Sequence, residues 1–202
     1  MQNPKLEYAK CSPGGFCILG RVIEKLTGKP YAVAVEELVL RRCGIHRMRI
    51  SGNTQAERAQ GEVTYYSQDE SDPYGMNVRR MDSHGGWLAS APDLARFLVR
   101  VDKFSTKPDI LRPETIQIMT TPSAASAGYA KGWAVNKYNN WWHSGSLPGT
   151  ITIMVRTAQE FCWAALTNTR APGDLGGDLD HLIWEMVGKV TVWPDHDLFE
   201  TA

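Results

Sequence analysis

The stretch Asn140-Trp141-Trp142-His143-Ser144-Gly145-Ser146-Leu147-Pro148-Gly149-Thr150 decides the fold, because it lies between two segments of strand character. Residues 131–137 precede it, residues 150–155 follow it, and a third such segment begins at residue 161. Short β-branched and aromatic runs that are separated by turn residues indicate an antiparallel meander. The stretch itself is either the wall of a site at a strand end or an aromatic-rich hairpin in a core.

Apolar residues at helical spacing predict helices on both sides of this meander. Residues 16–26 carry an apolar stripe and end before Gly28, and residues 31–42 form a second helix that ends before Gly44. Ser90 is the expected N-cap of a third helix, and residues 112–119 form a short fourth one. Residues 178–187 give a last helix. The stripe of the first helix consists of Phe16, Leu19, Val22, Ile23 and Leu26.

Composition narrows the class of protein. The chain has 202 residues and no net charge, which suits one domain and gives no reason to expect nucleic acid or an anionic membrane as partner. No run is long enough for a membrane span, and the first residues carry no signal-peptide core, so we expect a cytoplasmic location. The four cysteines have no zinc spacing and are interpreted as reduced packing residues. They are Cys11, Cys17, Cys43 and Cys162.

Two polar segments lie between the helices. Residues 51–82 are rich in turn residues and predict a long loop with short strands, which is either the wall of a site or a solvent-exposed insertion. His84 follows this loop and either contacts a ligand or forms hydrogen bonds within the loop. No metal or cofactor is expected, because a site from Asp180, His181 and His196 is only weakly supported.

The segment from Trp142 to Gly149 resembles the third motif of the serine β-lactamase-like superfamily. This group includes class C β-lactamases, D-alanyl-D-alanine peptidases and family VIII-type esterases, whose motif of Lys or His, then Ser or Thr, then Gly lies on a strand beside the active site. Two further segments resemble the family. They are Gly20-Arg21-Val22-Ile23-Glu24-Lys25-Leu26-Thr27-Gly28 and Gly85-Gly86-Trp87-Leu88-Ala89-Ser90 with the helix that follows.

The resemblance implies an α/β fold of the α+β type, in which an antiparallel meander is flanked by helices. It covers nearly all of this chain but only the C-terminal half to two-thirds of a family member, without the N-terminal strands and the nucleophile helix. We expect a single domain over residues 1–202. Its parts are a helix pair in residues 1–50, a helical and loop region in 51–125, and the meander with the last helix in 126–202.

The resemblance also implies serine chemistry, in which a Ser-x-x-Lys nucleophile forms an acyl-enzyme. No serine of this chain has a lysine three residues later. The family's second motif, Tyr-x-Asn, allows two registers here. One places Cys11-Ser12-Pro13 on Tyr-Ser-Asn and loses both functional residues, and the other keeps Tyr8 with Lys10 in place of asparagine. A cation beside Tyr8 would favour its phenolate.

The third motif supplies the remaining site residues that the resemblance implies. His143 would orient substrate or relay a proton, and the amide of Ser146 is the expected oxyanion donor, so both join Tyr8 as candidate catalytic residues. Ser144 would bind a substrate carboxylate, and Gly145 would let substrate approach the strand. The candidate substrate-binding residues are Lys10, Ser12, Trp142, Ser144 and Gly145.

Two functions follow from this resemblance. The first is ester or amide hydrolysis of a small acyl substrate, completed by a Ser-x-x-Lys segment from elsewhere, and the second is a non-catalytic remnant that binds a ligand or partner. The strand Phe161-Cys162-Trp163-Ala164-Ala165-Leu166 would lack its N-terminal neighbour. An open apolar edge invites pairing, so we expect self-association or docking of a complementary N-terminal segment there.

Overall fold

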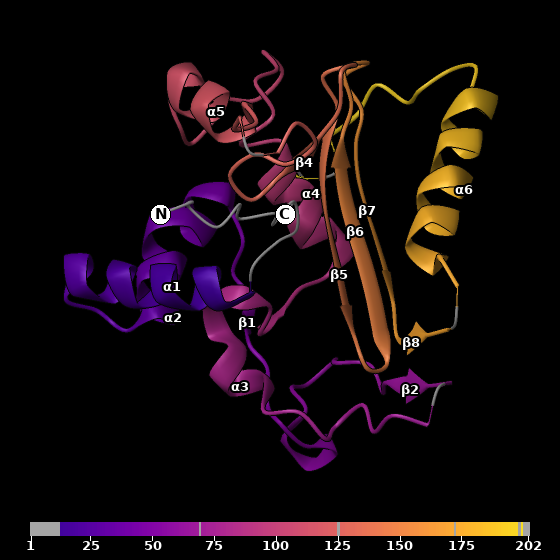
Figure 1. The fold of residues 1–202 in the computed structure, drawn as a ribbon. Coiled ribbons are helices and arrows are strands. Elements are labelled where there is room, and N and C mark those ends of the chain that lie inside the picture. Colours follow the sequence, from indigo (N-terminus) through magenta and orange to yellow (C-terminus); the bar gives the residue numbers. More distant parts are fainter. Residues whose placement is uncertain (1–12, 69, 125, 172, 198, 200–202) are drawn as a thin grey trace, which may run out of the picture.

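The computed structural model describes residues 13–68, 70–124, 126–171, 173–197 and 199 (Figure 1). Its first helix, α1, spans Pro13–Thr27 and ends as predicted at Gly28, which has a φ of 66° and donates its amide to the carbonyl of Glu24. Only glycine adopts this left-handed conformation without a steric penalty, so the helix ends there.

The second helical segment is less regular than the predicted helix over residues 31–42. It starts as α2, Tyr31–Val35, widens into a π-helical turn, η1, over Glu36–Leu40, and tightens into a 3-10 turn, η2, over Arg41–Cys43. Gly44 ends the segment with a φ of 70°. The changes of pitch bring Leu40, Cys43 and Ile45 into one buried cluster, because π and 3-10 turns rotate the following side chains differently from α turns.

The loop predicted between residues 51 and 82 is present and contains only short elements. Strand β1, Arg49–Ile50, pairs with β3, Trp87–Leu88, and β2, Tyr66–Ser67, pairs in parallel with β8, Thr169–Arg170. The remaining short elements are η3, Gln55–Glu57, α3, Val78–Met81, and η4, Asp82–His84. The pairing of β2 with β8 attaches the loop to the four-stranded main sheet described below, because β8 directly follows the last strand of that sheet.

Two further helices precede the sheet. Helix α4, Ala91–Leu98, begins at a capping box in which the Ser90 hydroxyl accepts from the Asp93 amide and the Asp93 carboxylate accepts from the Ser90 amide. Helix α5, Pro113–Thr120, starts at a proline, which suits the first turn because it has no amide to leave unpaired. Both starts agree with the sequence prediction.

The main sheet has the strand order β4-β5-β6-β7 and is antiparallel throughout, as expected for a meander. Its strands are β4, Ala134–Val135, β5, Trp141–Leu147, β6, Thr150–Arg156, and β7, Cys162–Thr167. Helix α6, Leu175–Lys189, covers one face, and α4 lies on the other (Figure 1). The central motif is therefore itself a strand, and the strand predicted over residues 131–137 is only two residues long.

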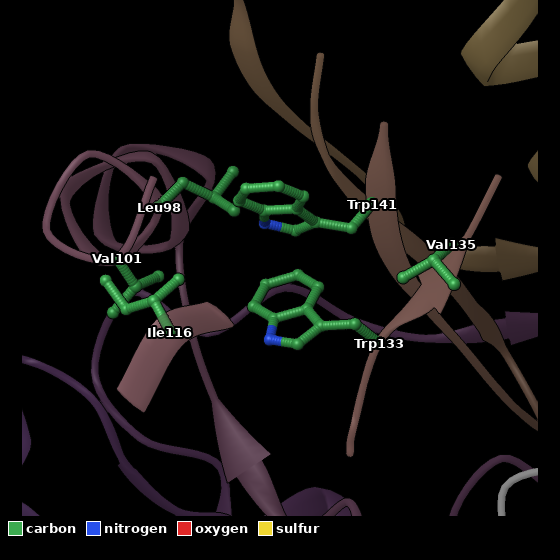
Figure 2. Packing of buried hydrophobic residues seen from close by; sticks show 6 residues of the cluster. All are labelled: Leu98, Val101, Ile116, Trp133, Val135 and Trp141. Carbon is green, nitrogen blue, oxygen red and sulfur yellow. The ribbon is translucent and has the colours of Figure 1, made fainter. Parts of the chain in front are cut away.

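The core on the α4 side is built around two indole rings. Trp133 and Trp141 pack with Leu98 and Val101 of the α4 region and with Ile116 of α5, and Val135 completes the cluster (Figure 2). On the other face, Ile153, Val155 and Trp163 pack against α6. Adjacent residues of a strand point to opposite faces, so Trp141 and Trp142 contribute to different cores.

The apolar stripe predicted for the first helix is not buried against the described residues. Leu19, Val22 and Leu26 are exposed, and 81% of the Leu26 surface is accessible. Helix α1 instead contacts η4 through its buried Gly20, because only a residue without a β-carbon leaves room for Ser83. The helix prediction is confirmed, and the contact with Ser83 is made at Gly20, which is not part of the stripe. No helix that the structure describes is long and apolar enough to cross a membrane.

Candidate active site

The candidate site lies along β5, whose edge is paired for only part of its length. Strand β4 pairs with Trp141 and Trp142 only, whereas β6 accompanies β5 along all seven residues. Beyond Trp142, the edge of β5 that faces away from β6 has no strand partner among the described residues. Backbone groups on this edge are therefore available to a bound molecule.

The pairing phase decides which amides point to that open edge. Leu147 and Thr150 face each other across the two-residue turn, and Asn136 donates its amide to the Asn140 carbonyl on the β4 side. Bonded and non-bonded pairs alternate along an antiparallel ladder. The pairs at the two ends of β5 agree on which residues bond to β6. The residues between these bonded ones turn the other way, so the amides of Ser144 and Ser146 point to the open edge. Neither amide is therefore used in the pairing with β6.

His143 lies on the same edge and has a fixed orientation. Its Nδ1 is 2.7 Å from the carbonyl oxygen of Gly132, in the loop that precedes β4. Because a carbonyl only accepts hydrogen bonds, Nδ1 carries the proton and Nε2 is left as an acceptor. The imidazole is partly buried and shares the face of Trp141, the side on which α4 lies. The Gly132 carbonyl thus fixes the orientation of the ring.

The remaining residues of the motif differ in their surroundings. Ser144, Gly145 and Ser146 are exposed, and a β-carbon on Gly145 would lie 3.0 Å from the Thr152 hydroxyl. The side chain of Trp142 lies on the opposite face from His143 and packs against the α6 core. Trp142 thus contributes packing beneath the site, and the open edge is formed by the three small residues.

Three of the sequence-predicted site residues, Tyr8, Lys10 and Ser12, lie outside the described residues, and so does Cys11. Both registers of the tyrosine motif therefore stay open. The motif precedes α1, whose first turns contact η4, the turn directly before the Gly85-Gly86 segment: the Ser83 hydroxyl donates to the Phe16 carbonyl at 2.9 Å. The helix that carries one family segment thus lies against the turn that leads into another.

The 51–82 loop borders the hairpin turn at the end of β5. A β-carbon on Gly149 would lie 2.8 Å from Pro73 and 2.9 Å from Tyr65, so the turn rests directly on the loop. The amide of Tyr65 donates to the hydroxyl of Tyr74, which holds this part of the loop together. The contact supports the interpretation of the loop as a wall beside the motif. Nothing in the sequence pairs Gly149 with residues so far away in the chain.

A surface hollow of about 440 Å³ lies at the other end of β5, between α5 and the β4–β5 turn. Its described lining consists mainly of amide and hydroxyl side chains, and Lys137 is the one ionisable group among them. Such a lining offers no nucleophile and base in combination. No cluster of three or more metal-ligating side chains occurs among the described residues.

The geometry of the motif strand agrees with a family comparison. The model of the Beta-lactamase family matches residues 11–187, which is most of the chain. The chain belongs to the Beta-lactamase family. This match covers the helix pair, the Gly85-Gly86 segment and the motif strand together, so the resemblance does not rest on one short motif.

Individual relatives of this β-lactamase-family chain are distant. It is 27% identical over 198 residues to an N-acetylmuramyl-L-alanine amidase of Bacillus subtilis, covering 77% of this chain and 43% of the relative. It is 23% identical over 170 residues to penicillin-binding protein 4 of Amycolatopsis lactamdurans, covering 75% and 44%. The chain spans less than half the length of these curated relatives.

A solved structure gives the same fold. The D-stereospecific amidohydrolase from Streptomyces sp. superimposes with a TM-score of 0.70 and 21% sequence identity, covering 90% of this chain and 55% of that one. The β-lactamase/transpeptidase-like fold expected from the sequence is thus confirmed. The family membership makes this chain part of a group of serine hydrolases with amidases and penicillin-binding proteins among its relatives.

Proposed function

We propose that this chain forms the C-terminal part of a serine hydrolase that cleaves esters or amides of small acyl substrates. The observation that carries the proposal is the open edge of β5, with the amides of Ser144 and Ser146 pointing outward beside the oriented imidazole of His143. No Ser-x-x-Lys sequence occurs in these 202 residues, so the nucleophile is proposed to come from a separate segment.

The proposed reaction follows the chemistry of acyl transfer. The serine hydroxyl of the separate Ser-x-x-Lys segment attacks the substrate carbonyl and gives its proton to the lysine of that segment. The carbonyl oxygen becomes an oxyanion, which accepts a hydrogen bond from the Ser146 amide. Collapse of this intermediate breaks the ester or amide bond and releases the alcohol or amine, which takes up the proton. Water then hydrolyses the acyl-serine. Tyr8 is the proposed second proton-transfer group, and Lys10, Ser12, Ser144 and Gly145 are proposed to contact substrate.

Within this class, we propose amides as the natural substrates. Two of the relatives are named as an amidase and an amidohydrolase, and a single oxyanion site serves both ester and amide carbonyls. His143 with its Nε2 free can also accept a hydrogen bond from an amide N–H of the substrate. An ester of the same acyl group should react faster than the amide, because its leaving group is better. Such an ester can therefore be used to assay the activity.

The edge strand β7 is the proposed docking place for the missing segment or for a second copy of the chain. Among the strands that the structure describes, β7 pairs in the main sheet with β6 only. The amide of Thr157 donates to the Phe161 carbonyl, so the alternation along β7 turns the backbone groups of Cys162, Ala164 and Leu166 outward. Three outward-facing residues can continue the ladder with another strand.

The alternative function is a non-catalytic remnant that binds a ligand or partner at the same edge. Its support is the lack of a Ser-x-x-Lys sequence in these 202 residues and the departure of residues 8–13 from Tyr-x-Asn in both registers of that motif. The two functions share the β5 edge but differ in covalent chemistry, so an acylation experiment separates them.

The experiment uses a fluorescent phosphonate and a fluorescent penicillin, with intact mass as the readout. The 202-residue chain is labelled alone and after mixing with a polypeptide that carries the Ser-x-x-Lys half of a family relative. We expect no adduct on the chain alone and an adduct on the added serine in the mixture. An adduct on a serine of this chain would overturn the need for a separate nucleophile. Binding of the polypeptide without any adduct would favour the non-catalytic function.

Two substitutions at one position test the oxyanion role. Ser146→Pro removes the outward amide, whereas Ser146→Ala keeps it and removes only the hydroxyl. We expect Ser146→Pro to lower acylation in the mixture by about 100-fold, the usual loss for one oxyanion donor, and Ser146→Ala to have little effect. Equal rates for both variants would contradict the role of the Ser146 amide.

A further inference from the structure

The thiol of Cys17 and the imidazole of His84 form a pair that the proposed acyl transfer does not use. Cys17 Sγ lies 2.8 Å from His84 Nδ1, although 67 residues separate them in the sequence. Cys17 is in the second turn of α1, and His84 ends the 3-10 turn η4. Both residues are partly buried, so neither is sealed in the core.

The neighbouring contacts hold this pair in place. The Ser83 hydroxyl donates to the Phe16 carbonyl, and Ser83 fills the space beside Gly20. The guanidinium of Arg21 forms an ion pair with the carboxylate of Asp82. Contacts on both sides of the thiol thus fix the position of His84 against the helix, and the imidazole does not have to be ordered before it can accept the thiol proton.

The other described cysteines have different surroundings. Burial raises the pKa of Cys43 to about 11 and that of Cys162 to about 12, and Asp102 beside Cys162 adds to its increase. Thiols of this kind are inert near neutral pH, because the thiolate is the nucleophile. Cys17 is the one described cysteine that has both a basic side chain in hydrogen-bond contact and access to solvent.

We propose that Cys17 is a thiol-modification site, activated by His84, that reacts with small disulfides. In the reaction His84 accepts the proton of the Cys17 thiol, and the thiolate attacks one sulfur of the disulfide. A mixed disulfide forms on Cys17, the disulfide bond of the reagent breaks, and the released thiolate takes the proton from the imidazolium. No net oxidation is needed beyond that already present in the small disulfide.

The mixed disulfide would act on the packing of α1. A group attached to Sγ occupies the space next to His84, which lies beside the tight contact between Gly20 and Ser83. Modification is therefore expected to separate η4 from α1 and to reverse when a reducing thiol is added. η4 lies directly before the Gly85-Gly86 segment that resembles the family.

The test measures labelling by oxidised glutathione at pH 7, with peptide mapping to separate the four cysteines. The variant Cys11→Ser removes the cysteine that lies outside the described residues. We expect Cys17 to react about tenfold or more faster than Cys43 and Cys162 in the folded protein, and all three to react at similar rates in urea. A Cys17 rate in the folded protein no higher than those of the buried cysteines would overturn the proposal.

Variants of His84 separate activation from accessibility. His84→Asn keeps a polar side chain of smaller size but is not a base, and His84→Ala opens the space beside the thiol. We expect both to lower the Cys17 rate by about tenfold, even though the alanine variant makes Cys17 more accessible. The matched control, His181→Ala, removes an exposed histidine on α6 and is expected to leave the rate unchanged. Unchanged labelling in both His84 variants, with intact circular dichroism, would contradict activation by His84.

Discussion

The guanidinium of Arg156 lies 3.8 Å from the ring centre of Trp141, on the neighbouring strand, and 4.0 Å from the ring centre of Phe104. Arg156 ends β6 and is 4% exposed, yet no carboxylate of the described residues forms a salt bridge with it. Its Nε and Nη1 donate to the carbonyls of Asp102 and Asn139. The buried charge is thus stabilised by two aromatic faces and two carbonyl oxygens. This cluster closes the end of the hairpin opposite to the Pro148-Gly149 turn.

Replacing Arg156 by methionine removes the charge but keeps the length of the side chain. We expect Arg156→Met to lower the free energy of unfolding by about 3 kcal/mol, because two cation–π contacts and two charge-assisted hydrogen bonds are lost and two carbonyls are left unpaired. Urea unfolding followed by tryptophan fluorescence measures this change. The control Arg47→Met alters an exposed arginine and should stay within about 0.5 kcal/mol of the wild type. Similar changes in the free energy of unfolding for the two variants would show that the Arg156 cluster contributes little to stability.

Asp102 makes the stability depend on pH. Burial raises the pKa of its carboxyl group above the ordinary value, and the nearby Asp109 adds to this, while the Phe104 amide and Arg156 act against it. The folded state therefore holds this proton more tightly than the unfolded chain. Its contribution to stability is fully present below the unfolded pKa of about 4 and is lost as the pH rises through the folded pKa.

Asp102→Asn removes this titration and keeps an oxygen that can accept from the Phe104 amide. Relative to the wild type, the free energy of unfolding of the variant is expected to increase as the pH is raised from about 4 to about 7. Urea unfolding of both proteins across that range gives the difference. Asp195→Asn, at an exposed position, serves as the control. If the variant's free energy of unfolding minus that of the wild type stays constant or falls as the pH rises, Asp102 does not have a raised pKa in the folded state.

Gly149 tests the contact between the hairpin turn and the 51–82 loop. It has a φ of 78°, and an alanine β-carbon would collide with Pro73 and Tyr65. Gly61 has a similar φ of 82° but no atom within 4 Å of the same position. We expect Gly61→Ala to cost about 1–2 kcal/mol from backbone strain alone, and Gly149→Ala to cost about 1–3 kcal/mol more from overpacking. If urea unfolding shows the same loss of stability for both variants, the 51–82 loop moves away from the new methyl group without an energetic penalty.

The edge of β7 is tested by two proline variants. Ala164→Pro removes an amide that points away from β6, whereas Ala165→Pro removes one that belongs to the β6–β7 ladder. If the edge mediates association, sedimentation velocity should give a complex for the wild type, either with itself or with the added Ser-x-x-Lys polypeptide. Ala164→Pro should abolish that complex and retain the fold. Ala165→Pro is expected to destabilise the fold itself by about 3 kcal/mol or more. A wild-type chain that stays monomeric and ignores the polypeptide would refute docking at β7.

Local signals predicted much of the fold. The end of α1 at Gly28, the capping box of Ser90 and Asp93, and the proline start of α5 each depend on a few neighbouring residues, and all three are present. The strand that carries the motif was expected from the family resemblance, whereas its surroundings alone suggested only a strand end. For the site, the sequence named His143 and Ser146, but the orientation of the imidazole and of the amide depends on Gly132 and on the pairing phase.

Contacts between distant segments could not be predicted in the same way. Helical spacing predicted an apolar stripe on α1, but not that Gly20 contacts Ser83 or that Leu26 is exposed. The sequence also gave no reason to place Cys17 beside His84 or Phe104 beside Arg156. Periodicity reports which side of a helix is apolar, but not which segment covers it.

The sequence by itself determined where α1 ends and where α4 and α5 begin, the antiparallel meander and the motif of the Beta-lactamase family, because turn residues, caps and alternation act over a few residues. Only the tertiary structure decided that the amides of Ser144 and Ser146 face an edge without a strand partner among the described residues, that Arg156 is buried against two rings, and that His84 contacts a thiol. These relationships arise where segments far apart in the chain are packed together, and their geometry follows from the packing of the whole domain rather than from any local pattern.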